Sequence, residues 1–95
     1  MARPKCPRVV SGTPVSHYFK PAGVPLRELR EVGMPVDHFE AIRLADLEGL
    51  SQVEAARRMG VSRQTFGRIL RQARTITARA LVRGEALRID SQETS

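Results

Sequence analysis

Eight arginines follow one another between Glu54 and Glu85 with no acidic residue among them. They are Arg57, Arg58, Arg63, Arg68, Arg71, Arg74, Arg79 and Arg83. Guanidinium groups without nearby carboxylates create a field of one sign, which attracts polyanions and releases the counterions condensed on their phosphates. They also make paired hydrogen bonds to phosphates and to guanine O6 and N7. The spacing therefore indicates recognition of a nucleic acid.

The segment 52–71 within this run has the pattern of a helix-turn-helix. Ala56 supplies a small residue where two helices cross, and Gly60 four residues later permits a positive φ in a tight turn. Val61 fills the turn, and Phe66 packs the next helix back on the previous one. We expect this unit to lay its second helix in the major groove of duplex DNA.

A helical wheel centred on Phe66 separates an apolar side of the segment 63–83 from a cationic side. The apolar side holds Phe66, Ile69, Leu70, Ala73, Ile76, Thr77, Ala80 and Leu81. The residues expected to contact base edges are Arg63, Gln64, Gly67, Arg68 and Arg71. Arginine can bond guanine there and glutamine can bond adenine, while glycine permits close approach of the helix.

A second set of residues is expected to bind phosphates and so to fix the angle at which the second helix lies on the DNA. The first turn of a helix has free backbone amides, which suit an anion. The set is Ser51, Gln52, Arg57, Arg58, Ser62, Thr65 and Arg74, and an N-terminal arm adds Arg3, Lys5 and Arg8. Whether this arm contacts DNA or packs on the core is left open by the sequence.

Cap and stop signals predict helices over 38–48, 52–59 and 63–83. The caps are Asp37, Ser51 and Ser62, and the glycines that follow are Gly49, Gly60 and Gly84. The expected apolar stripes are Phe39, Ile42, Leu44 and Leu47 in the first helix, and Val53, Ala56 and Met59 in the second. The apolar surface of the third helix extends past what the two shorter helices can cover, through Ile76, Ala80, Leu81 and Val82. The end of this helix is expected either to dimerise or to pack on the arm.

All six prolines fall in the first 35 residues, which excludes a long helix there. Short strands are expected at 9–10, 17–19 and 86–89, the last pairing with the proline-rich arm, and a single helical turn at 26–29. We divide the chain into a basic arm, residues 1–36, a helix-turn-helix domain, residues 37–84, and a strand with a frayed tail, residues 85–95. Together they form one globular domain.

The 95 residues have a net charge of +6 and one cysteine, Cys6. They contain no internal disulfide, no multi-cysteine zinc site and no apolar run of the ~18 residues that cross a bilayer. We expect a cytoplasmic protein that contacts no membrane. Without a catalytic triad, phosphate-cradling loop or metal motif, we expect no enzyme activity, cofactor or metal.

Three stretches resemble an uncharacterised prokaryotic family of predicted DNA-binding proteins. They are the opening Met1 to Lys5, the stretch Tyr18 to Leu26 (YFKPAGVPL) and the run Ala45 to Thr65, with the specific motif GVSRQTFGRIL at 60–70. The resemblance implies a mainly α fold whose three-helix helix-turn-helix is similar to region four of sigma factors, within the winged-helix-like superfamily.

The expected function is therefore transcriptional regulation by binding of double-stranded DNA. A homodimer is expected because one recognition helix reads only a few base pairs, and the sigma-like resemblance implies RNA polymerase as a further partner. Two alternatives stay open. One is a protein-interaction module that docks an acidic partner, and the other is a metal or redox sensor centred on Cys6.

Overall fold

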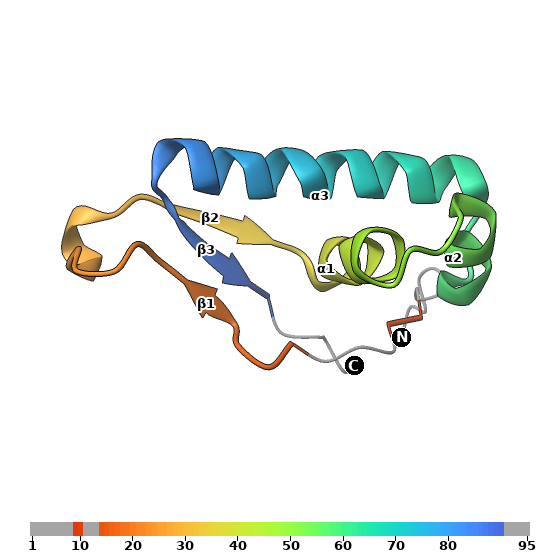
Figure 1. Cartoon of the computed structure of the whole chain (residues 1–95), viewed down its shortest axis with the longest axis horizontal. Helices are drawn as coiled ribbons and strands as arrows, with labels where there is room; N and C mark the ends of the chain where they lie inside the picture. The colour runs from red at the N-terminus through yellow and green to blue at the C-terminus, as the bar shows by residue number, and fades with distance from the viewer. Residues whose placement is uncertain (1–8, 11–13, 91–95) are drawn as a thin grey trace, which may run out of the picture.

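The computed structural model describes residues 9–10 and 14–90, and one long helix, α3, runs along the longest dimension of the molecule (Figure 1). Its elements in chain order are β1 (Tyr18–Phe19), η1 (Leu26–Glu28), β2 (Glu31–Met34), α1 (Val36–Ile42), η2 (Arg43–Leu47), α2 (Gln52–Met59), α3 (Arg63–Arg83) and β3 (Ala86–Ile89). The protein is mainly helical, with three α-helices and a small sheet of three strands in the described part of the chain.

The long helix has two different neighbours along its length. Helices α1 and α2, with η2 between them, pack against the first half of α3, and the sheet lies beneath the second half (Figure 1). Twenty-one residues of α-helix extend for about 31 Å, which is long enough to serve both layers. The first half of α3 is therefore held by helices and the second half by strands.

The strand that is last in sequence is central in the sheet. β3 pairs antiparallel with β1 and parallel with β2, giving the order β1-β3-β2. The register places Tyr18 opposite Arg88 on one side and Gly33 opposite Arg88 on the other. The predicted strand over 86–89 and its pairing with the N-terminal segment are confirmed. The second partner, β2, was not predicted.

Buried hydrophobic residues occur along the inner side of α3, and those of its first half form one cluster with the other helices. The buried hydrophobic residues are Met34, Ala41, Leu44, Ala55, Ala56, Met59, Phe66, Ile69, Leu70, Ala73, Ala80, Ala86 and Ile89. Phe66, Leu44 and Met59 are the largest side chains of the cluster that joins α3 to the other helices. The predicted placement of Phe66 at the centre of the apolar side is therefore confirmed.

Helices α2 and α3 begin and end where their local signals predicted. The Ser51 hydroxyl accepts a hydrogen bond from the Glu54 amide at 3.1 Å, and the Ser62 hydroxyl accepts one from the Thr65 amide at 3.1 Å. Such caps satisfy amides that a helix leaves without partners. The predicted bounds 52–59 and 63–83 are confirmed.

The helix predicted over 38–48 is confirmed in part, because its second half is not an α-helix. The segment is α1 followed by the π-helical turn η2, in which the Glu48 amide donates to the Arg43 carbonyl five residues earlier, at 2.9 Å. A wider turn changes the angular position of each later side chain, so the 3.6-residue periodicity no longer applies. Leu47, predicted in the apolar stripe, is consequently 79% exposed.

The start of the first helix also differs from the prediction. The capping position belongs to Pro35, whose carbonyl accepts hydrogen bonds from the amides of His38 and Phe39. Asp37 lies inside the first turn instead, where its carboxylate is 2.7 Å from His38 Nδ1. Because Pro35 has an extended ψ and a helix-compatible φ, the helix begins directly after it.

Two further expectations about apolar residues were wrong. Val53 is 56% exposed because Ala55, rather than Val53, completes the buried face of α2. Residues 9–10 are not a strand, although the Val9 amide donates a backbone hydrogen bond to the Met59 carbonyl. Leu81 is 78% exposed because only the narrow sheet covers that end of α3, and dimerisation through this end stays a prediction. The helical turn near 26–29 is confirmed as η1.

Candidate nucleic-acid interface

The turn between α2 and α3 is built by small and apolar residues acting together. Gly60 has a φ of +69°, a left-handed conformation that costs a side-chain-bearing residue energy, and its amide donates to the Ala56 carbonyl. The Val61 amide also donates to the Ala56 carbonyl, at 3.0 Å. Phe66 is fully buried one turn into α3. These contacts fix the direction in which the first half of α3 projects.

The residues predicted to contact bases lie on the first half of α3. Arg63, Gln64, Arg68 and Arg71 are exposed, and Gly67 is half-buried. No carboxylate within residues 9–10 and 14–90 forms an ion pair with Arg63, Arg68 or Arg71 (the salt bridges there involve other cations). We call these three the free arginine row. Their charge is consequently available to an external anion.

Gln52 and Gly67 are brought together, although they belong to different helices. A Cβ atom at residue 67 would lie 3.3 Å from Gln52 Oε1, closer than an ordinary contact. The glycine therefore leaves space for the Gln52 side chain to lie across α3. This contact joins a predicted phosphate ligand to a predicted base-contacting position.

Replacing Gly67 with alanine is expected to stabilise the fold and, if this face of α3 binds duplex DNA as the sequence predicts, to weaken that binding. Alanine in a helix interior is favoured over glycine by roughly 0.5 to 1 kcal/mol, whereas the added methyl group displaces Gln52. Thermal unfolding and titration of a selected duplex measure the two effects. The loss of affinity is expected to shrink in a Gln52→Ala background, and an unchanged affinity of Gly67→Ala would contradict a role for this contact.

The predicted phosphate ligands divide into capping residues and paired arginines. Ser51 and Ser62 cap their helices, and the Ser62 hydroxyl donates to Thr65 Oγ1 at 3.0 Å. Arg57 and Arg58 both contact the Glu54 carboxylate, at 3.0 Å and 3.5 Å, while much of each side chain stays exposed. Surface pairs of this kind contribute little energy, so a phosphate can compete for these arginines.

Arg74 differs from the free arginine row because it has a strong partner. Two of its nitrogens donate to the Asp46 carboxylate, at 2.6 Å and 3.2 Å, and these hydrogen bonds lower the pKa of Asp46. The pair joins η2 to α3. A phosphate that bound Arg74 would therefore have to displace a carboxylate in bidentate geometry.

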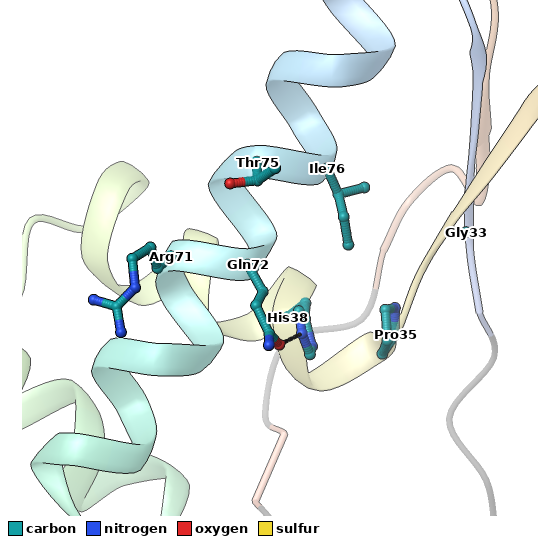
Figure 2. Close-up of a pocket in the computed structure, with 7 residues that line it drawn as sticks. All are labelled: Gly33, Pro35, His38, Arg71, Gln72, Thr75 and Ile76. Atoms are coloured by element: carbon teal, nitrogen blue, oxygen red, sulfur yellow. Dashed lines mark hydrogen bonds between the residues drawn. The ribbon is translucent and has the colours of Figure 1, made fainter.

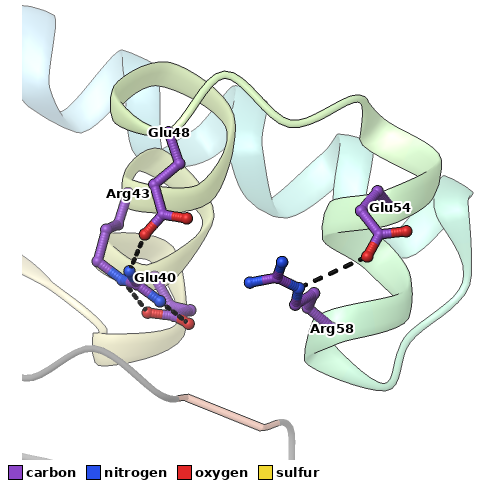
Figure 3. A network of polar contacts seen from close by, with 5 residues as sticks. All are labelled: Glu40, Arg43, Glu48, Glu54 and Arg58. Carbon is purple, nitrogen blue, oxygen red and sulfur yellow. Dashed lines mark hydrogen bonds and ion pairs between the residues drawn. The ribbon is translucent and has the colours of Figure 1, made fainter.

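A second ionic cluster consists of Glu40, Arg43 and Glu48, which belong to α1, η2 and the residue that follows η2 (Figure 3). Glu40 is only 1% exposed, and both of its carboxylate oxygens accept hydrogen bonds from Arg43 at 2.9 Å. Arg43 also contacts Glu48, and the hydrogen bond to Glu40 is the main cause of its raised pKa. A buried carboxylate needs such hydrogen bonds, and Arg43 supplies two of them within the α1–η2 segment against which α3 packs.

An open groove beside α3 was not predicted (Figure 2). It is lined by Gly33, Pro35, His38, Arg71, Gln72, Thr75 and Ile76. His38 Nε2 is 3.0 Å from Gln72 Oε1, and the Arg71 side chain points away from this pair. Residues 38 and 72 are far apart in sequence, and each alone resembles an ordinary surface residue, so no local signal identifies their contact.

The remaining predicted residues lie outside the described part of the chain. Arg3, Lys5 and Arg8 of the predicted arm, and Cys6 of the alternative sensor, fall in residues 1–8. Among residues 9–10 and 14–90, no three His, Cys, Asp or Glu side chains are grouped to hold a metal ion. Over the same residues, no helix combines the length and apolarity that crossing a membrane requires.

The fold and the interface together define a small, mainly helical protein with a three-stranded sheet and an exposed arginine row. The chain belongs to the family described as "Protein of unknown function DUF134", whose model matches residues 1–95. The predicted membership of a prokaryotic family of uncharacterised proteins is thereby confirmed. No solved structure gives a significant match to the chain.

Relatives differ in how far they extend beyond the matched part. A UPF0251 protein of Desulfosudis oleivorans is 57% identical over 90 residues, covering 95% of this chain and 65% of the relative. UPF0251 protein VPA0321 of Vibrio parahaemolyticus is 50% identical over 95 residues, covering all of this chain and 99% of the relative. The chain therefore spans about two thirds of the first relative and nearly all of the second.

Proposed function

We propose that this protein binds double-stranded DNA through a helix-turn-helix formed by α2 and α3, and that it regulates transcription. The observation that supports the proposal most is the free arginine row. Three exposed arginines in the first half of α3 have no carboxylate partner among the described residues, and two of them, Arg68 and Arg71, lie on the side of the helix opposite the buried Phe66. One arginine can make two hydrogen bonds to guanine, to O6 and N7. An exposed arginine face therefore suits the edges of bases in the major groove.

The mechanism is occupancy of a DNA site rather than chemistry. In the proposed complex the first half of α3 enters the major groove, where Arg63, Gln64, Arg68 and Arg71 contact bases. The capped start of α2 and the exposed arginines Arg57 and Arg58 contact phosphates on either side. One recognition helix reads few base pairs, so we propose that two copies bind neighbouring half-sites. RNA polymerase is proposed as a further partner at such a site.

The test is selection of duplexes from a random pool, followed by titration at several salt concentrations. We expect enrichment of a short sequence and a linear fall of log affinity with log salt, by about 0.9 for each phosphate neutralised. Absence of enrichment together with a flat salt response would reject DNA binding. That result would favour the alternative of an interaction module for a protein partner.

A further inference from the structure

Arg74 is held by Asp46 through two hydrogen bonds. Arg74 Nη2 donates to Asp46 Oδ1 at 2.6 Å, and Arg74 Nε donates to Asp46 Oδ2 at 3.2 Å. Paired hydrogen bonds between a guanidinium group and a carboxylate are stronger and more directional than a single contact. They are also the main cause of the lowered pKa of Asp46, which keeps the carboxylate charged at neutral pH. These two donors of Arg74 are therefore already engaged in the protein without DNA.

The contact is open to solvent. The side chain of Arg74 is 55% exposed and that of Asp46 is 40% exposed. The pair joins η2 to α3, but exposed ion pairs contribute little to stability. An external anion can consequently reach the guanidinium group, and the fold does not depend on Asp46 keeping it.

Arg74 lies on the same side of α3 as the start of α2. Residue 67 of α3 faces the side chain of Gln52, the first residue of α2. Arg74 follows Gly67 by about two helical turns, so the two positions differ by about 20° around α3 and by about 10.5 Å along it. In the proposed complex, the DNA strand whose phosphates contact the start of α2 therefore passes close to Arg74.

A phosphate and the Asp46 carboxylate use the same donors. Both are anions whose oxygens accept paired hydrogen bonds from a guanidinium group. The Nε and Nη2 atoms of Arg74 cannot serve both anions at once in this geometry. We propose that Asp46 takes the place of a DNA phosphate on Arg74 and thereby lowers the affinity of the protein for every duplex. This inference rests on the proposed function and adds a control on the strength of binding.

The effect of Asp46 concerns affinity and not the choice of sequence. Contacts to phosphates position a protein on DNA but carry no sequence information, whereas contacts to base edges do. The free arginine row has no carboxylate partner among the described residues, so the arginines proposed to read bases stay available. With Arg74 engaged, the protein depends more on base contacts and binds less tightly to DNA of unrelated sequence.

The test compares three variants of the full chain with the wild type. Asp46→Asn removes the carboxylate charge and keeps the shape of the side chain. Asp90→Asn is the matched control, because Asp90 also pairs with an exposed arginine, Arg88, and its side chain is 43% exposed. A double variant, Asp46→Asn with Arg74→Gln, removes the released guanidinium group as well. Each protein is titrated with a random-sequence duplex at several salt concentrations, and thermal unfolding checks that the fold is retained.

We expect Asp46→Asn to bind this duplex about 2-fold to 5-fold more tightly than the wild type. Its plot of log affinity against log salt is expected to steepen by about 0.9, the value for one further phosphate neutralised. The double variant is expected to return to the wild-type slope, because it has gained no free cation. Asp90→Asn is expected to leave the slope unchanged, because Arg88 keeps its contact with Glu31 in the sheet.

Three outcomes would overturn this inference and leave DNA binding in place. An unchanged slope for Asp46→Asn would show that Asp46 does not compete for Arg74. An equal steepening for Asp90→Asn would show a general effect of net charge. A steeper slope that persists in the double variant would place the gain outside Arg74. A wild-type protein that binds no duplex at all would overturn both the inference and the proposed function.

Discussion

Replacing Arg68 with alanine is expected to weaken binding to the selected duplex by roughly 1 to 3 kcal/mol, or about 5-fold to 150-fold. Arg68 is exposed in the middle of the free arginine row, and no carboxylate of the described residues neutralises it. Alanine is at least as good a helix former as arginine, so α3 keeps its structure. The loss should be concentrated at one base pair of the site, which titration of single-base variants of the duplex measures.

Arg83→Ala is the matched control for this substitution. Arg83 is an exposed arginine of the same helix, about 22 Å further along its axis, and no described carboxylate pairs with it. We expect it to leave the preference at that base pair unchanged. If Arg68→Ala instead weakened binding to every sequence equally, Arg68 would be a phosphate ligand rather than a reader of bases.

Replacing Phe66 with alanine is expected to lower the free energy of unfolding by about 3 to 5 kcal/mol. Phe66 is fully buried where α3 meets α1, η2 and α2, and its removal leaves a cavity that the surrounding helices cannot fill. Small domains have a total stability of ~5 to 15 kcal/mol, so much of the chain could be unfolded at 37 °C. Urea denaturation followed by circular dichroism measures the change.

Leu81→Ala is the control for burial. Leu81 was predicted on the same apolar side of α3 but is largely exposed, so its truncation is expected to change stability by less than about 0.5 kcal/mol. Comparable losses in the two variants would mean that the end of α3 is covered in solution. That result would point to the proposed second copy as the covering surface.

The helices that carry the interface were predictable because their signals are local. Ser51 and Ser62 supply side-chain caps, and the glycine at position 60 supplies the left-handed residue that ends α2. Each signal acts within four residues, so no knowledge of tertiary structure is needed. The exposure of Arg68 and Arg71 follows directly, because they lie on the side of α3 opposite its buried face.

The elements that were missed depend on partners distant in sequence. Strand β2 contains Glu31 and Gly33 and is followed by Pro35, which is not a strand pattern. Its backbone is extended because it pairs with β3, and the Asp90 amide directly after β3 donates to the Met34 carbonyl at 2.9 Å. The need for glycine at position 33 also follows only from tertiary structure, because the Arg88 side chain occupies the space where a Cβ atom would lie.

The same limit applies to the polar contacts around the interface. The cationic character of Arg74 was clear from the sequence, but its pairing with Asp46 crosses from η2 to α3. The π-helical turn that places Asp46 there has no recognisable sequence signal. Charge counting therefore identifies the face that attracts a polyanion but does not show which of its arginines are already engaged.

The central position of β3 has a consequence for the order in which the parts of the chain fold. β1 and β2 do not pair with each other. Each pairs with β3, which follows them in the chain by some fifty to seventy residues. Closing such long loops is entropically costly and slows folding relative to neighbouring helices. We therefore expect the helical layer to form first and the sheet beneath the far half of α3 to form last, around β3.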